Sequence, residues 1–294
     1  MPIQRPAAPP GPPPADFPAP WACAWGEDRR GLWQAFRYRG VEQRLRWIPP
    51  PPASFLMGSP ETEADRFDRE QQHQVQLTRG YWLAETACTQ ALWEAVMAKN
   101  PSRFNGPQRP VDQVSWDDAR RFIGRLNELF DAALAQASAR LPAVERELLG
   151  LAPQPAEPPP ERFRLPSEAE WEYACRAGST SAYAFGDAFD PALANFSAET
   201  GAVGSLPPNS WGLYEMHGNV SEWCQDWLGD YPGGPVVDPV GPAAGVGRVL
   251  RGGSWLYPPR LLRSAFRYGF VPGHRYWFTG LRLARGSELA EPGE

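Results

Sequence analysis

Lysine and histidine are nearly absent from this sequence. Lys99 is the only lysine and there are three histidines in 294 residues, so arginine carries almost all of the positive charge. His73, His217 and His274 are too far apart to form the closely spaced pair that is typical of a metal site. The base composition of the gene is the simplest explanation of the arginine bias, although arginine is also better suited than lysine to two-pronged pairing with carboxylates.

Cysteine pairs and long apolar runs are also missing. The four cysteines (Cys23, Cys88, Cys175 and Cys224) lie far apart without a C-x-x-C pair, which is typical of reduced thiols in a cytosolic protein. No stretch contains the roughly 18 to 20 apolar residues that a membrane span requires, and the N-terminus has no apolar signal core. We therefore expect a cytoplasmic protein without a membrane segment.

Proline and glycine, by contrast, are abundant. The chain has 35 prolines and 28 glycines, while 42% of its residues are hydrophobic. This composition favours a loop-rich fold with an ample core. We expect a mobile Pro/Ala tail over residues 1–20 and a single domain over residues 21–285. A peripheral helical insertion is expected at about 131–161, and a short tail at 286–294.

One segment, residues 248–285, differs from the rest of the chain in charge. It contains eight arginines and no acidic residue, although the whole chain has a net charge of -5. Many aromatic residues lie between these arginines, as expected in a core or a contact surface. Val249 and Leu250 at one end, and Leu281 and Leu283 at the other, predict two short, half-buried strands. The middle has neither a helical nor a strand period, so we expect a loop there.

Three positions carry signals for the start of a helix. Thr89 can cap a short helix that extends to about residue 99, and Ser115 precedes a second helix with acidic residues in its first turn. Ser167 and Glu170 have the spacing of a capping box before a third helix. His217 lies beside a Gly-Asn turn, where we expect a packed, structural histidine.

Seven blocks of residues occur in order along the chain. They are Phe55–Ser59 (FLMGS), Glu85 with Thr89 and Gln90, Pro110–Val111 with Val114–Trp116, Arg164–Ala174 (RLPSEAEWEYA), Trp211–Trp223 (WGLYEMHGNVSEW), Arg251–Trp255 (RGGSW) and Gly280–Leu283 (GLRL). These blocks resemble the signature of the formylglycine-generating-enzyme (sulfatase-modifying factor) domain family. The resemblance covers about residues 53 to 285. It implies an α+β, C-type-lectin-like fold with short strands, few helices and extensive loops.

The resemblance does not imply an activity by itself. Sulfatase-activating members carry a pair of copper-binding cysteines shortly after the Gly-Gly-Ser block, and Tyr257 and Leu262 stand at those places here. Cys224 is an isolated thiol and cannot replace the pair. The iron-dependent oxidases that share this domain take histidine ligands from a separate helical domain, which we do not find in this sequence. We therefore expect no enzymatic activity, and the alternative is an oxidase of one of these two kinds.

A third branch of the family resembles this chain in the blocks Arg251–Trp255, Arg263–Arg267 and Gly280–Leu283. These are the variable proteins of diversity-generating retroelements. The resemblance implies a display protein that binds a protein or another macromolecule through a diversified C-terminal surface, with Arg263 and Arg267 fixing the segment. The implied ligand-binding surface positions are Leu256, Tyr257, Leu261, Phe266, Tyr268, Gly269, Phe270, His274, Tyr276, Trp277 and Phe278.

Other interpretations of this segment stay open. About half of its aromatic residues would be core if the domain has little other apolar mass near its C-terminus. The same blocks also occur in undiversified members of the family. The arginines suggest nucleic-acid binding, but the net charge is negative and no nucleic-acid motif is present, so we do not expect a nucleic-acid partner.

The resemblance also implies a calcium site, the one cofactor that we consider. A Gly-Asn-x-x-Glu turn in the family can supply backbone carbonyls and a carboxylate, and Gly218, Val220 and Glu222 match this turn. Asn195 is a second candidate ligand. Oxygen-rich loops suit calcium. The alternative is a structural Glu222 that accepts hydrogen bonds from loop amides.

Overall fold

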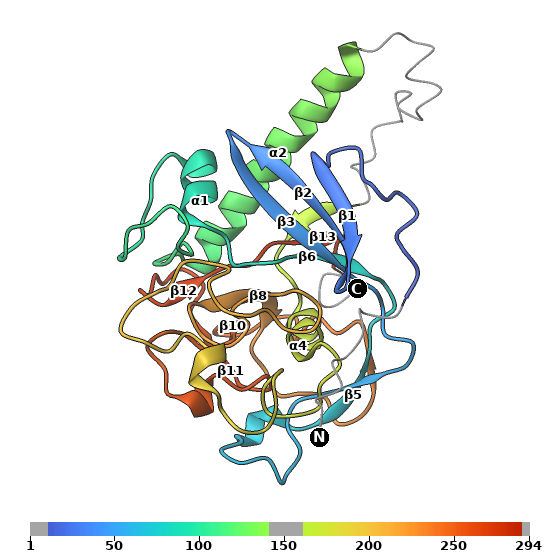
Figure 1. The fold of residues 1–294 in the computed structure, drawn as a ribbon. Helices are drawn as coiled ribbons and strands as arrows, with labels where there is room; N and C mark the ends of the chain where they lie inside the picture. The colour runs from blue at the N-terminus through green and yellow to red at the C-terminus, as the bar shows by residue number, and fades with distance from the viewer. Residues whose placement is uncertain (1–10, 141–160, 290–294) are drawn as a thin grey trace.

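The structure of this chain is a computed structural model that describes residues 11–140 and 161–289. The helices and strands are short, apart from one long helix, and loops connect three separate sheets (Figure 1). This is the predicted α+β architecture. Most of the predicted insertion at about 131–161 lies outside the described residues, and its first part, to Arg140, continues the long helix.

The largest sheet has six antiparallel strands in the order β1-β2-β3-β6-β13-β7. Its strands are β1 (Ala24–Asp28), β2 (Gly31–Tyr38), β3 (Val41–Ile48), β6 (Tyr81–Ala84), β13 (Ala284–Gly286) and β7 (Arg162–Arg164). Because β13 pairs with both β6 and β7, the end of the domain is fixed inside this sheet. Phe36 and Leu45 from β2 and β3 are buried in the core.

Two smaller sheets complete the domain. One has the order β11-β10-β8-β12 and the other the order β4-β5-β9. The strands of the first are β8 (Ser221–Trp227), β10 (Arg248–Arg251), β11 (Arg267–Phe270) and β12 (Thr279–Gly280). Those of the second are β4 (Phe55–Met57), β5 (His73–Gln76) and β9 (Val236–Val237). His73 thus lies in a strand, as its alternating sequence context predicts.

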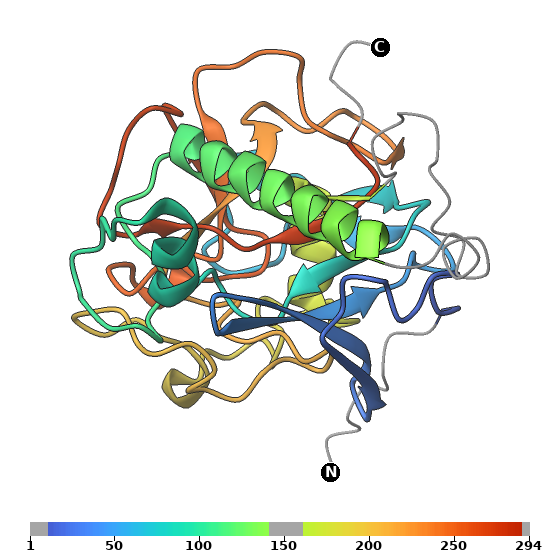
Figure 2. The same cartoon turned by 90° about the horizontal axis from the view of Figure 1, so that it is seen from above.

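Two helices cover one face of the molecule (Figure 2). In α1 (Gln90–Met97), the Thr89 hydroxyl accepts a hydrogen bond from the Leu92 amide at 3.2 Å, which confirms the predicted cap. The long helix α2 (Trp116–Arg140) begins directly after Ser115, as predicted. Phe130 of α2 packs edge-on against Phe36 in the large sheet, with ring centroids 5.0 Å apart. None of the helices in the described ranges has both the length and the apolar character for a membrane span.

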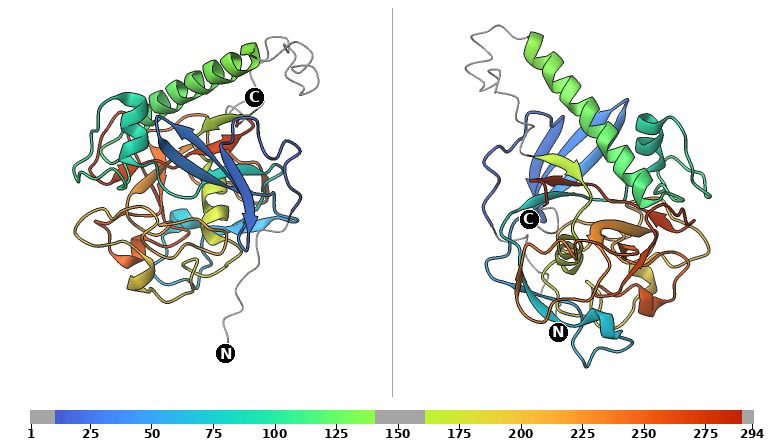
Figure 3. Two further views of the ribbon diagram at one scale, coloured as in Figure 1. Left: turned by 45° about the horizontal axis from the view of Figure 1, so that its top comes forward. Right: turned by 180° about the vertical axis from the view of Figure 1, so that it is seen from behind.

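The third helix, α4 (Glu168–Arg176), lies in the middle of the molecule (Figures 1 and 3). All nine of its residues are buried, including three glutamates. The predicted capping box is present, since the Ser167 hydroxyl accepts from the Glu170 amide at 3.1 Å and Glu170 accepts from the Ser167 amide at 2.8 Å. A buried helix with acidic side chains requires cationic partners from other segments.

We expect replacement of Ser167 by alanine to lower the free energy of unfolding by about 1 kcal/mol, because the Glu170 amide would lose its acceptor inside the protein. Urea denaturation measures this difference. Ser167→Thr, which keeps the hydroxyl, serves as the control and should remain close to the wild type. Equal stability of the alanine and threonine variants would contradict a capping role.

Part of the predicted mobile tail is packed on the domain. Phe17 stacks on Trp82 with ring centroids 5.9 Å apart, and the Ala19 amide donates to the Gln34 side chain at 3.1 Å. The prediction of a mobile tail up to residue 20 is therefore wrong for the part around these residues. A single aromatic residue in a proline-restricted segment gains enough buried area to offset the modest entropy that such a segment loses. Residues 1–10 lie outside the described ranges.

Candidate binding surface

Residues 251–282 contribute strands to both edges of the four-stranded sheet, since β11 is its first strand and β12 its last. Strand β10 pairs antiparallel with β11, with Arg251 opposite Arg267. The predicted strand at Val249–Leu250 is therefore confirmed, although both residues are fully buried and not half-buried as predicted. The prediction that the middle is all loop is wrong, because β11 lies within it. Strand β11 could not be recognised from the sequence, because Arg267 and Tyr268 are both buried and polar and apolar residues do not alternate along it.

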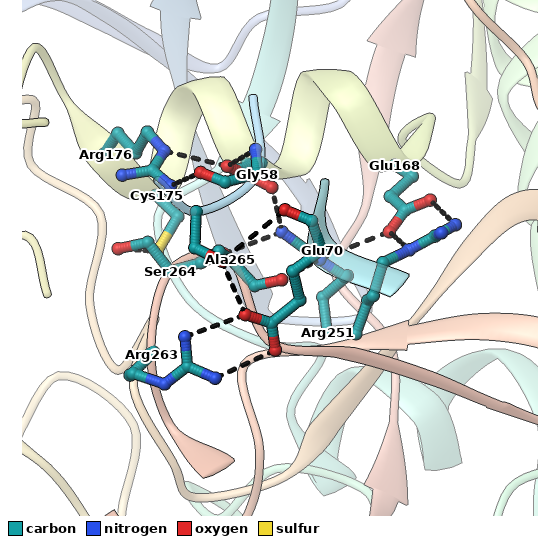
Figure 4. A network of polar contacts seen from close by, with 12 residues as sticks. Gly58, Glu70, Glu168, Cys175, Arg176, Arg251, Arg263, Ser264 and Ala265 are labelled. Atoms are coloured by element: carbon teal, nitrogen blue, oxygen red, sulfur yellow. Dashed lines mark hydrogen bonds and ion pairs between the residues drawn. The ribbon is translucent and has the colours of Figure 1, made fainter. Parts of the chain in front are cut away.

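The first arginine of the segment, Arg251, points into the core toward helix α4 (Figure 4). Its guanidinium pairs with Glu168 at 3.2 Å and with Glu172, and it also donates to the backbone carbonyls of Ser264 and Ala265. Glu168 and Glu172 of α4 thus receive from Arg251 the cationic partner that their burial requires, and Glu170 pairs with Arg164 at 2.6 Å. The same guanidinium fixes the chain 13 and 14 residues further on.

Arg263 and Arg267 are buried in the same way. Arg263 binds both carboxylate oxygens of Glu70 at 2.8 Å (Figure 4). It also pairs with Glu63 at 2.5 Å. Arg267 binds both oxygens of Glu168 at 2.7 and 2.6 Å. Burial by itself lowers the pKa of Arg267, but the negative charge of Glu168 outweighs it and keeps the pKa above the ordinary value. The expected anchoring role of these two arginines is confirmed.

Arg282 is fully buried, at 0% exposure. It binds the Glu222 carboxylate with Nε and Nη2 at 2.9 Å and donates to the carbonyls of Ala84, Glu85 and Tyr214. The prediction of a half-buried strand at 281–283 is therefore wrong: these residues lie between β12 and β13 rather than in a strand, and the leucines and the arginine are all buried. The backbone connects to β6 by a hydrogen bond from the Ala84 amide to the Leu283 carbonyl.

The same contacts decide the role of Glu222. Both of its oxygens accept from Arg282, and one also accepts from the Trp171 indole at 2.7 Å. A carboxylate already neutralised by a guanidinium is a weaker calcium ligand, so these contacts favour the structural alternative for Glu222, and the calcium site stays a prediction. The Asn195 carbonyl accepts from the Asn219 amide at 2.8 Å, and the Gly218 amide donates to Gly252. These contacts hold the turn in place within the fold.

The outward side of the segment carries large apolar side chains. Leu256 is 45% exposed and Trp277 is 46% exposed, and His274 is exposed as well. The half-buried residues beside them are Tyr257, Leu261, Gly269, Phe270 and Tyr276. The ring centroids of Phe270 and Tyr276 lie 4.3 Å apart, so these two half-buried rings pack against one another.

Three predicted surface residues lie in the core instead. Phe266, Tyr268 and Phe278 are each less than a tenth exposed, and Phe266 stacks on Tyr268 at 5.3 Å. The Tyr268 hydroxyl bonds to Ser221, and burial raises its pKa well above the ordinary value. The surface prediction is wrong for these three residues, because their aromatic rings fill the space between β11 and the rest of the core.

Residues from another loop extend this face. Arg103 lies over the Trp277 ring at 4.8 Å, and Phe104 packs edge-on against Trp255 at 5.3 Å. Arg275 binds both oxygens of Asp118, at 2.5 and 2.7 Å, and so fixes the loop to the start of α2. Sequence reasoning missed these neighbours because they are more than 100 residues away and follow no motif. We define the binding face as Leu256, Tyr257, Leu261, Phe270, His274, Tyr276 and Trp277, with Arg103 at its edge.

Three of the four cysteines and His217 are buried, and only Cys23 is exposed. The His217 Nδ1–H donates to the Leu262 carbonyl at 2.7 Å, and its Nε2 accepts from the Ala184 amide at 3.0 Å, so the predicted structural role is confirmed. Burial lowers its pKa to about 4. Burial also raises the pKa of Cys175 to about 12, and Cys88 and Cys224 are equally buried. Within the described ranges, no three His, Cys, Asp or Glu residues form a group that could bind a metal ion.

Comparison with known proteins identifies the family. Residues 47–287 match the sulfatase-modifying factor enzyme 1-like domain. The formylglycine-generating enzyme of Thermomonospora curvata is 31% identical over 231 residues, which cover 69% of this chain and 63% of that enzyme. The serine/threonine-protein kinase pkn1 of Chlamydia pneumoniae is 45% identical over 128 residues, which cover 42% of this chain and 21% of the kinase. The chain thus spans between a fifth and two thirds of these relatives.

Solved structures support the same conclusion. Treponema denticola variable protein 1 superposes with a TM-score of 0.69 and 31% identity, covering 86% of this chain and 98% of that protein. PvdO from Pseudomonas aeruginosa superposes with a TM-score of 0.63 and 24% identity, covering 90% and 98%, and shows the fold alone. This chain belongs to the sulfatase-modifying factor enzyme 1-like domain family and has its C-type-lectin-like α+β fold.

Proposed function

We propose that this protein is a non-enzymatic display protein that binds a protein or another macromolecule through the binding face, as a variable protein of a diversity-generating retroelement. The observation that carries the proposal is the division of the C-terminal segment into two sets of side chains. Arg251, Arg263, Arg267 and Arg282 point inward and are paired with buried glutamates, while Leu256 and Trp277 point outward.

This division suits a surface whose residues change while its backbone stays in place. The inward arginines bind carboxylates and carbonyls, so their contacts do not depend on which side chains stand outside. Outward aromatic residues offer large contact areas at a low cost in side-chain entropy, which favours recognition of macromolecules. The 31% identity to Treponema denticola variable protein 1 over nearly its whole length supports the same assignment.

An oxidase is not favoured by the site geometry. Tyr257 and Leu262 stand where a sulfatase-activating enzyme would need cysteines. The buried thiol of Cys175 has a raised pKa and sits between His217 and Ser264, where it has no access to a substrate. A thiolate, which is the reactive form, is disfavoured in such a site.

Sequencing of the DNA that flanks the gene tests the proposal. We expect a reverse transcriptase gene and a template repeat that matches the codons of residues 251–285 except at adenines. The differing codons should encode residues of the binding face and spare the four inward arginines. A gene without such a repeat, or differences that fall on the arginine codons, would contradict the proposal.

A further inference from the structure

Apart from the binding face, the structure contains a cavity between the small β4-β5-β9 sheet and the N-terminal end of α4. Its volume is about 430 Å³, within the range of small-molecule sites. Much of its wall is apolar and is built from Met57, Val236, Val240 and Pro242. Such a wall suits a compact hydrophobic group rather than a sugar or a phosphate.

One carboxyl group, that of Asp226, lines this cavity from its buried side. The residue is 3% exposed, and its Oδ2 accepts a hydrogen bond from the Glu168 amide at 2.8 Å. No ion pair connects Asp226 to a cation within residues 11–140 and 161–289. The nearby guanidinium of Arg267 also lines the cavity, but both oxygens of Glu168 already bind it.

The rim of the cavity adds negative charge. Asp230 is exposed there, and the Tyr231 hydroxyl donates to Glu168 at 3.1 Å. The Tyr231 ring is already covered, because Arg267 lies over it at 3.9 Å and His73 packs against it at 4.4 Å. The group in the cavity that still lacks a charged partner is therefore a carboxyl, and its natural complement is an ammonium ion.

We propose that this cavity binds a small hydrophobic amine, whose ammonium group pairs with Asp226 while its hydrocarbon part contacts Met57 and Val240. The proposal does not depend on the function of the binding face. An anionic ligand would have to compete with Glu168 for Arg267 and would meet the negative charge of Asp230. A neutral ligand would leave the ionised form of Asp226 without a cation.

Ligand binding should be linked to protonation of Asp226. Burial, and then the negative charge of Glu168, raise the pKa of Asp226 to about 8. Below this pH the free protein carries a protonated Asp226, so the amine must displace a proton. Affinity should rise by about tenfold per pH unit as the pH increases from 6 toward 8. The charged or titratable groups that face Asp226 or line the same cavity are Glu168, Arg267, Tyr231, His73 and Asp230.

Calorimetric titration with three matched probes, benzylamine, benzyl alcohol and benzoate, tests the proposal on the full chain. We expect benzylamine to bind at least tenfold more tightly than either of the others at pH 8. Titration at pH 7 in buffers of different ionisation enthalpy should reveal release of close to one proton per bound amine. Equal binding of the alcohol, tighter binding of benzoate, or no binding of any probe would overturn the proposal.

Two substitutions give a matched comparison. Asp226→Asn keeps the shape and an acceptor for the Glu168 amide, and it should reduce benzylamine affinity more than tenfold and abolish proton release. Asp230→Asn removes an exposed charge at the rim and should change affinity less than threefold. If the Asp226 variant does not fold, proton release by the wild type still tests the proposal. Binding of the amine to the wild type without release of a proton would contradict a role for Asp226.

Discussion

Replacement of Arg282 by methionine is expected to destabilise the protein by about 3 to 5 kcal/mol. The substitution would leave the buried Glu222 carboxylate without a cation and would remove the donors for the carbonyls of Ala84, Glu85 and Tyr214. Each buried polar group that is left without a hydrogen-bond partner lowers the free energy of unfolding further. Urea or thermal unfolding of the purified variant measures the loss.

Two control variants show whether the loss of stability comes from breaking the buried ion pair or simply from removing a positive charge. Arg37 and Glu42 form an ion pair at 2.7 Å in which both side chains are exposed, so Arg37→Met should change the free energy of unfolding by less than about 1 kcal/mol. The double variant Arg282→Met with Glu222→Gln should be more stable than the single variant, because it no longer buries an unpaired charge. Similar losses for Arg37→Met and Arg282→Met would refute the anchoring role.

The second large expected effect on stability concerns the three buried aromatic residues under the binding face, Phe266, Tyr268 and Phe278. We expect Phe278→Ala and Tyr268→Ala each to cost about 3 to 5 kcal/mol, because both rings are buried and each removal leaves a cavity in the core. Leu256→Asp and Trp277→Asp should each cost less than about 1 kcal/mol, since these side chains are nearly half exposed. Denaturation midpoints of the four variants provide the measurement.

The contrast between the two pairs is the decisive result for the binding face. The guanidinium of Arg103 lies 4.8 Å from the centroid of the Trp277 ring. Replacement of Trp277 therefore also removes a cation–π contact, which contributes little to stability at an exposed site. If the aspartate variants lost as much stability as the alanine variants, the outward side chains would be core residues. The candidate face would then have no exposed anchors.

Local rules predicted the parts of the fold that depend on near neighbours. The caps at Thr89 and Ser167 lie three residues from their partners, so sequence spacing was enough to find them. The strand at Val249–Leu250 was found from its apolar residues. Strand β11 escaped prediction because its backbone pairs with β10 while its side chains do not alternate between core and solvent.

The candidate face was predicted as eleven surface positions, and three of them, Phe266, Tyr268 and Phe278, are buried instead. The segment was visible because aromatic and arginine residues concentrate in it without any acid. Which of the aromatic residues point outward could not be predicted, because Tyr268 and Phe270 lie two residues apart in one strand and differ in burial. The edge formed by Arg103 and the fixing of Arg275 by Asp118 have no local signal at all.

The sequence by itself determined the family, the α+β class and the places where helices begin, because these follow from ordered motifs and from contacts a few residues apart. Only the tertiary structure decided what the charged residues do. Arg263 and Glu63 are separated by 200 positions, and a carboxylate such as Glu222 looks the same in sequence whether it binds calcium or a guanidinium. The choice depends on which group reaches it in the folded core, where an unpaired charge is too costly to remain.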